Sequence, residues 1–192
     1  MATKQRQRSY NAMEKIGQGG YQEVFLYKDI VIKIAESTTN SQAIKINEYL
    51  QELKSIGVNV PKYYGYHIIN NQLFSFWGFT GKPLSQALLE LNAKEVINIV
   101  KSIISLIKIS NKEKIAFYPR IDQFTYQSKK VYFVDFYPTR LQSDFDNYKE
   151  DKKLALKDKL YSKEFRINKL IEEVTNIRPD LDKSLRLILC QK

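Results

Sequence analysis

Strand-forming and helix-forming patterns occupy different halves of this chain, which restricts the folds it can adopt. The first 80 residues contain runs of β-branched and aromatic residues separated by short turns, and one segment with helical spacing at 41–56. Two pairs of runs have the short gaps that are typical of hairpins. The first predicted strand begins at residue 12. The two predicted hairpins pair 24–27 with 30–34 and 63–69 with 73–79. We therefore predict five strands with one helix after the third.

The second half of the chain is predicted to be mostly helical. Residues 84–91 and 93–109 have helical periodicity, and further helices are expected from residue 154 to the end. Two short strands, at 124–126 and 131–134, interrupt this half. The pattern predicts an α+β protein with two small lobes, divided as 1–79, a connector at 80–83, and 84–192.

Composition excludes several classes of protein. Cys190 is the only cysteine, so no internal disulfide can form, and no run of 18 apolar residues suggests a membrane span. The first eight residues are basic and polar, unlike a signal peptide. We expect a soluble, cytoplasmic protein.

The formal net charge of +10 is large for 192 residues. It is compatible with phosphate-rich ligands, acidic partners, nucleic acid or an anionic membrane, although a lysine-rich solvated surface is the simplest explanation. Acidic residues interrupt the basic segment 149–169, which argues against a continuous nucleic-acid stripe there. His67, the only histidine, lies in a predicted strand and is interpreted as structural.

A glycine-rich segment lies near the N-terminus. Gly17, Gly19, Tyr21 and Val24 follow the spacing G-x-G-x-aromatic-x-x-V. Glycines in such a loop let the backbone approach phosphate groups without a Cβ in the way. A glycine-rich hairpin turn would have the same appearance, so this motif requires support from elsewhere in the chain.

Lys33 and two acidic residues supply that support. Lys33 ends an Ile-Val-Ile run, where a charge is costly unless it faces a polar cleft. Asp135 ends the apolar run 131–134, and Asp122 lies thirteen residues before it. Carboxylates are the hard oxygen ligands that Mg²⁺ prefers.

In this order, the motifs resemble those of the protein-kinase-like superfamily, over roughly residues 13–140. The resemblance implies a two-lobed fold with a five-stranded antiparallel N-lobe containing one helix and a reduced, mostly helical C-lobe. It implies ATP and Mg²⁺ as cofactors, with residues 80–83 as the hinge. Lys33 would hold the α- and β-phosphates and pair with a glutamate of the following helix, either Glu48 or, one turn later, Glu52.

The region of the expected catalytic loop departs from the family pattern. With Asp135 as the metal-binding aspartate, Asp122 occupies the position of the second metal ligand, normally asparagine. The position of the catalytic aspartate then falls on Phe117 and that of the preceding histidine on Ile115, neither of which can accept a proton. Tyr137 replaces the family's glycine.

Three explanations of this departure stay open. In the first, the loop is degenerate and the protein is a pseudokinase. In the second, Tyr118, Arg120 or Asp122 takes over the chemistry. In the third, a gap shifts the alignment, so that Asp122 is the base and Gln127 the metal ligand. Loss of a general base costs typically ~10²–10⁴-fold in rate, which does not by itself exclude activity. Arg120 is the candidate for neutralising phosphate charge, and with Arg140 it is hypothesised to line an anion site.

The leading functional prediction is an ATP- and Mg²⁺-binding kinase-like protein, with an atypical phosphotransferase lacking the usual catalytic aspartate as its active form. The alternative is a pseudokinase that acts as a binding or regulatory module. A basic nucleic-acid- or membrane-associated domain is the least favoured. The expected partners are a nucleotide and either a small-molecule acceptor or a protein.

Overall fold

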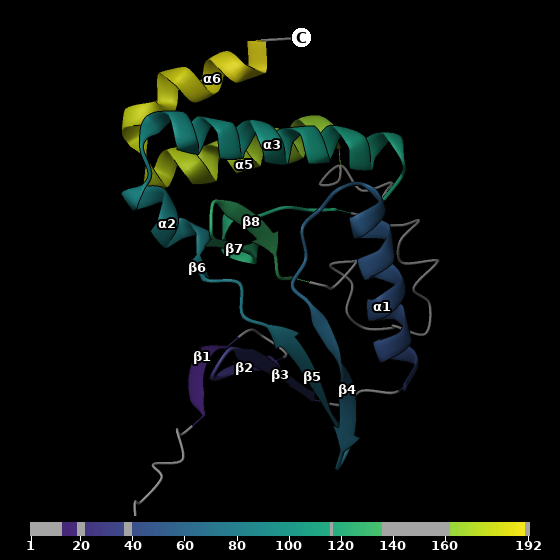
Figure 1. The fold of residues 1–192 in the computed structure, drawn as a ribbon. Helices are drawn as coiled ribbons and strands as arrows, with labels where there is room; N and C mark the ends of the chain where they lie inside the picture. The colour runs from purple at the N-terminus through teal and green to yellow at the C-terminus, as the bar shows by residue number, and fades with distance from the viewer. Residues whose placement is uncertain (1–12, 19–21, 37–39, 116, 136–161, 191–192) are drawn as a thin grey trace, which may run out of the picture. The chain divides into compact units, whose positions relative to one another are not determined.

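The computed structural model describes residues 13–18, 22–36, 40–115, 117–135 and 162–190. Its residues divide into two compact units (Figure 1). Unit 1 comprises the described residues within Met1–Thr39 and Lys62–Phe79, and unit 2 those within Asn40–Pro61 and Thr80–Lys192.

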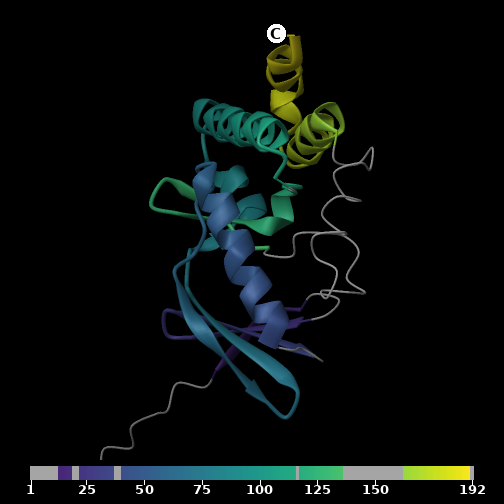
Figure 2. The same cartoon turned by 90° about the vertical axis from the view of Figure 1, so that its right-hand side faces the viewer.

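Unit 1 is a five-stranded antiparallel sheet in the order β1-β2-β3-β5-β4. The strands are β1 (Glu14–Gln18), β2 (Gln22–Tyr27), β3 (Ile30–Glu36), β4 (Tyr63–Ile69) and β5 (Gln72–Gly78). The predicted five strands are thus confirmed. Asn70 and Asn71 connect β4 to β5 with positive φ values of 50° and 62°, a conformation that asparagine tolerates in a two-residue turn. The resulting long, twisted hairpin is seen in Figure 2.

Unit 2 contains five helices among its described residues, together with a small sheet. The helices are α1 (Asn40–Ser55), α2 (Leu84–Glu90), α3 (Ala93–Lys112), α5 (Lys163–Ile177) and α6 (Asp182–Cys190), and the 3₁₀ turns are η1 (Ile121–Gln123) and η4 (Pro179–Leu181). The strands β6 (Lys82–Pro83), β7 (Phe124–Gln127) and β8 (Lys130–Phe133) pair antiparallel in that order. The α+β class is confirmed.

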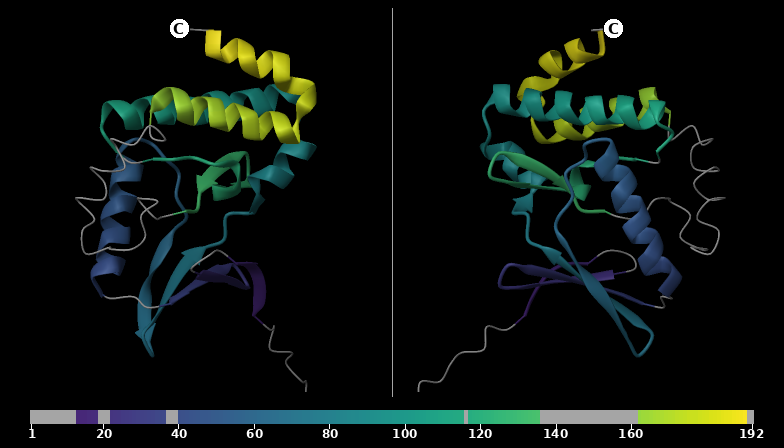
Figure 3. Two further views of the ribbon diagram at one scale, coloured as in Figure 1. Left: turned by 180° about the vertical axis from the view of Figure 1, so that it is seen from behind. Right: turned by 45° about the vertical axis from the view of Figure 1, so that its right-hand side comes forward.

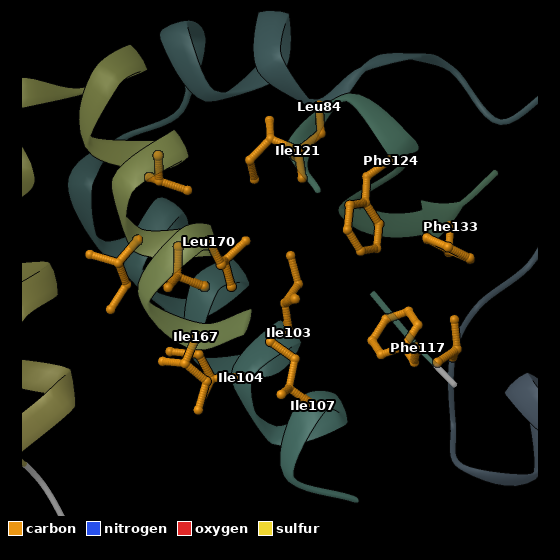
Figure 4. Packing of buried hydrophobic residues seen from close by; sticks show 14 of the residues in the cluster. Leu84, Ile103, Ile104, Ile107, Phe117, Ile121, Phe124, Phe133, Ile167 and Leu170 are labelled. Atoms are coloured by element: carbon orange, nitrogen blue, oxygen red, sulfur yellow. The ribbon is translucent and has the colours of Figure 1, made fainter. Parts of the chain in front are cut away.

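One apolar cluster forms the core of unit 2. Helices α3 and α5 lie side by side (Figures 1 and 3) and bury Val100, Ile103 and Ile107 from α3 with Leu170 and Val174 from α5. Aromatic residues from the β7–β8 hairpin complete the cluster (Figure 4). The capping box at Asn92 and Glu95 begins α3, since each side chain accepts a hydrogen bond from the other residue's backbone N–H.

Helix α1 belongs to unit 2, although the sequence-based division placed it in the N-terminal lobe. Tyr49, Leu53 and Ile56 are buried in the core cluster of unit 2. Gly57 ends the helix at a φ of +86°, as the sequence predicted. The division at residue 80 coincides with the start of the last segment of unit 2.

None of the helices in the described part of the chain is long and apolar enough to cross a membrane.

Candidate functional site

A single row of paired residues in unit 1 contains three of the residues predicted to hold phosphate. Gly17 on β1 pairs with Val24 on β2, and Val24 pairs with Lys33 on β3. The row continues to Ser75 on β5. Side chains of directly paired residues point to the same face of a sheet, so Val24, Lys33 and Ser75 share one face.

The face that carries Lys33 is formed around Trp77. The indole Nε1 of Trp77 donates a hydrogen bond to Ser75 Oγ at 2.9 Å, and Ser75 Oγ donates to the backbone oxygen of Lys33 at 3.5 Å. Lys33 is half-buried, and its Nζ lies 5.7 Å from the centroid of the Trp77 ring, within the range of a cation–π interaction. Trp77 itself is 2% exposed, so the lysine stem lies against a fixed aromatic surface.

Several predicted residues are not tested by this geometry. Gly19, Tyr21, Tyr137 and Arg140 lie outside the described residues. Their proposed roles, including the paired-arginine anion site, stay predictions.

The glutamate partners predicted for Lys33 lie on α1, in unit 2. Glu48 is exposed and Glu52 is half-buried. Because Lys33 belongs to unit 1, its pairing with either glutamate stays a prediction.

Asp135 follows strand β8 in unit 2, and its contact with Gln123 defines its position. Gln123 Nε2 donates a hydrogen bond to Asp135 Oδ2 at 2.6 Å. The amide oxygen of Gln123 accepts from the backbone N–H of Arg120 at 3.0 Å, and the backbone oxygen of Gln123 accepts from Val134 N at 2.8 Å. Gln123 therefore links Asp135 to the loop that precedes β7.

Asp122 is adjacent to Gln123 but makes a different contact. Its Oδ2 accepts a hydrogen bond from Arg120 Nη2 at 2.7 Å. The two side chains are 62% and 46% exposed, so this is a surface ion pair of little energetic weight. The structure thus brings the two predicted catalytic residues, Asp122 and Arg120, into contact with each other.

The positions expected for the catalytic histidine and aspartate are occupied by core residues. Ile115 and Phe117 are 7% and 0% exposed, and both belong to the apolar cluster of unit 2. The Phe117 ring contacts the Phe133 ring edge-on, with centroids 5.2 Å apart (Figure 4). Neither position presents a proton acceptor.

Helix α5 holds the segment between Phe117 and Ile121 at both ends. Arg166 is 1% exposed, and its Nη1 donates to the backbone oxygen of Phe117 at 2.6 Å and to Ser110 Oγ at 3.0 Å. Two turns further along α5, Glu173 Oε2 accepts from the backbone N–H of Ile121 at 2.8 Å. These contacts fix the segment that carries Arg120 and leads directly into Asp122 and Gln123.

Sequence analysis missed Gln123, Arg166 and Glu173. Gln123 carries no charge and stands beside a more conspicuous acid. A signal for Arg166 existed, because it occupies the same helical face as the apolar Leu170 and Val174, where a charge must find polar partners. Glu173 gave no such signal, since it lies beside that face in a charged segment.

The oxygen donors of unit 2 are compatible with magnesium. No group of three or more acidic, histidine or cysteine side chains is clustered for metal binding in the described residues. Magnesium, however, is commonly held by one or two carboxylates together with substrate phosphates. Asp135 is half-buried and accepts a hydrogen bond from Gln123, and Asp122 is exposed and accepts one from Arg120, so their joint binding of magnesium stays a prediction.

Neither the protein-family models nor the curated proteins with which the sequence was compared gave a match.

Proposed function

We propose that this chain is a kinase-like protein that binds ATP with magnesium. The observation that carries the proposal is the row in unit 1 that aligns Gly17, Val24 and Lys33 on adjacent strands. Adjacent strands lie ~4.8 Å apart, so Gly17 and Lys33 are ~10 Å apart across the sheet, a distance that a triphosphate can span. Lys33 is the residue assigned to the phosphates.

The magnesium assignment rests on unit 2. Asp135 is assigned as the first ligand because Gln123 orients its carboxylate, and Asp122 is assigned as the second. The α5 contacts of Arg166 and Glu173 support this assignment, since they hold the segment 117–121, which leads directly into Asp122.

A second function, nucleotide binding without transfer, is favoured by one observation. Phe117 occupies the position of the catalytic aspartate and is fully buried. An atypical phosphotransferase would need another group, and the residue assigned to that role is Asp122, an exposed acid five residues further along the chain. Both functions share the nucleotide site and differ only in the chemical step.

Nucleotide binding is tested by thermal denaturation with ATP, with and without Mg²⁺. At an ATP concentration 100 times Kd, binding adds about 2.7 kcal/mol, which raises the Tm by roughly 5–10 °C for a chain of this size. The rise should require Mg²⁺ and should be lost in Lys33→Met, which removes the charge, and in Asp135→Ala, which removes the oxygen ligand.

Two matched variants serve as controls. Lys54→Met and Asp29→Ala make the same chemical changes at exposed positions. They should keep the full rise in Tm. Absence of any rise in the wild type would contradict nucleotide binding, and a rise that survives both site variants would contradict the residue assignment.

Transfer is tested separately, by measuring ADP release from ATP. Turnover that Asp122→Asn abolishes would support Asp122 as the acid–base group. Turnover that Asp122→Asn retains would support its role as a metal ligand, because asparagine also provides an oxygen ligand. Nucleotide binding with no turnover in the wild type would favour the pseudokinase.

A further inference from the structure

Helix α3 carries four exposed lysines in one line. Lys94, Lys101, Lys108 and Lys112 are all exposed, and we call them the lysine stripe. They are separated by seven, seven and four residues. At 100° per residue these spacings place all four within an arc of about 40°, over about 27 Å of helix axis.

Acidic side chains barely offset this charge. The only acid within α3 is Glu95, which is half-buried and accepts a hydrogen bond from the backbone N–H of Asn92 in the capping box. Of the four lysines, only Lys112 has an acidic oxygen of a described residue within 4 Å. That oxygen is Glu113 Oε1 at 3.8 Å, in a fully solvated pair. The stripe is therefore a local concentration of positive charge.

The helix beside α3 does not supply the missing negative charge. The two exposed glutamates of α5 are paired on their own helix, Glu164 with Lys163 at 3.2 Å and Glu172 with Lys169 at 3.1 Å. Glu173 is directed to the backbone of Ile121. Within the described part of the chain, the acidic side chains of α3 and α5 therefore leave most of the charge of the stripe unbalanced.

The surroundings of the stripe favour a phosphate backbone over a membrane or stacked bases. A helix that lies in a membrane surface exposes an apolar face, whereas the main apolar face of α3, including Val96, Val100 and Ile104, is buried in the core. Proteins that bind single strands stack bases on aromatic side chains, and α3 contains none. The polar residues along the stripe, Asn98 and Ser105, are exposed hydrogen-bonding groups.

We propose that the lysine stripe binds the sugar–phosphate backbone of a double-stranded nucleic acid, without reading its sequence. Lysines spaced about 10.5, 10.5 and 6 Å apart along a straight helix form a line of charge that matches a rigid, charged partner, and each would neutralise one phosphate. The binding does not depend on the nucleotide site, since none of the four lysines belongs to it.

The test measures binding of a fluorescent 20-base-pair duplex, as DNA and as RNA, between 50 and 200 mM salt. Four phosphate contacts give a slope of about −3.6 in log K against log salt, a fall of about 150-fold over this range. The variant with glutamine at all four stripe positions should flatten that slope by about 3.6. Far-UV circular dichroism and the Tm verify that α3 still forms.

A charge-matched variant separates the stripe from the net charge of the protein. Lys54, Lys62, Lys130 and Lys183 are exposed lysines outside α3, and replacing all four by glutamine removes the same charge. This variant should retain most of the slope. Equal losses in the two variants, absence of duplex binding by the wild type, or tighter binding to phosphatidylserine vesicles than to the duplex would each overturn the proposal.

Discussion

Gly81 is the position at which an added methyl group should most disturb the fold. It precedes β6 at a φ of +86°, and a Cβ there would lie 2.2 Å from the backbone oxygen of Tyr126 on β7. Both atoms are fixed by the β6–β7 pairing, so neither can move aside without breaking it. The left-handed conformation costs alanine ~1–2 kcal/mol, and the overlap adds ~1–3 kcal/mol. Gly81→Ala should therefore destabilise the protein by about 2–5 kcal/mol.

Two other glycines separate these contributions. Gly57 has the same φ of +86°, but the atom nearest to its added Cβ is Leu106 Cδ2 at 3.9 Å, so Gly57→Ala should show the conformational cost alone. Gly17 has no positive φ, and its nearest contact is Val24 Cβ at 3.6 Å, so Gly17→Ala should cost least. Urea denaturation measures all three. A Gly81→Ala cost no greater than that of Gly57→Ala would refute the close β6–β7 approach.

Three further predictions concern Gln123, Arg166 and Tyr63. Gln123→Leu removes the donor to Asp135, a charge-assisted hydrogen bond worth ~1.5–3 kcal/mol, and should weaken magnesium-dependent ATP binding at least ~10-fold; an unchanged Kd in a titration would contradict the role of Gln123. Arg166→Met removes the hydrogen-bond donor to the buried carbonyl of Phe117 and should lower the free energy of unfolding, measured in urea, by about 2–4 kcal/mol. A loss below ~1 kcal/mol would refute a stabilising role for this contact. Burial raises the pKa of Tyr63 from 10.0 to about 12, so its stabilising effect is complete below pH 10 and is lost as the pH rises towards 12. The unfolding free energy of Tyr63→Phe should therefore fall less steeply over this range than that of the wild type, and parallel curves would contradict the shift.

Local patterns predicted most of the fold correctly. The alternating and β-branched runs gave the strands of unit 1, and the period of α3 is regular because one face enters a core. Strand β6 was not predicted, since Lys82 and Pro83 are too few for a pattern and form a strand only by pairing with β7. Local patterns also could not predict that α1 belongs to unit 2, because this depends on packing between residues distant in the chain.

The candidate site was only partly predictable for a related reason. Lys33 was singled out because a charge at the end of an apolar run is costly without a polar partner, and Asp135 because it ends an apolar run at a fixed spacing from Asp122. Gln123 makes the contact that positions Asp135, yet an uncharged amide has no such cost at the surface of a loop. Arg166 acts on Phe117 from 49 residues away, a separation that no local pattern reports.

Phe117, at the position where the kinase-like resemblance predicts a catalytic aspartate, is a residue of the core. Its ring is fully buried between residues that include Phe133, so Phe117→Asp removes an aromatic core residue, at ~3–5 kcal/mol, and also buries a carboxylate. Domains are stable by about 5–15 kcal/mol, so this variant should be largely unfolded at 25 °C by circular dichroism. A folded and catalytically active Phe117→Asp protein would mean that the segment can present position 117 to solvent, and it would contradict a structural role for Phe117. The unfolded outcome would instead restrict any catalytic role to exposed groups such as Asp122.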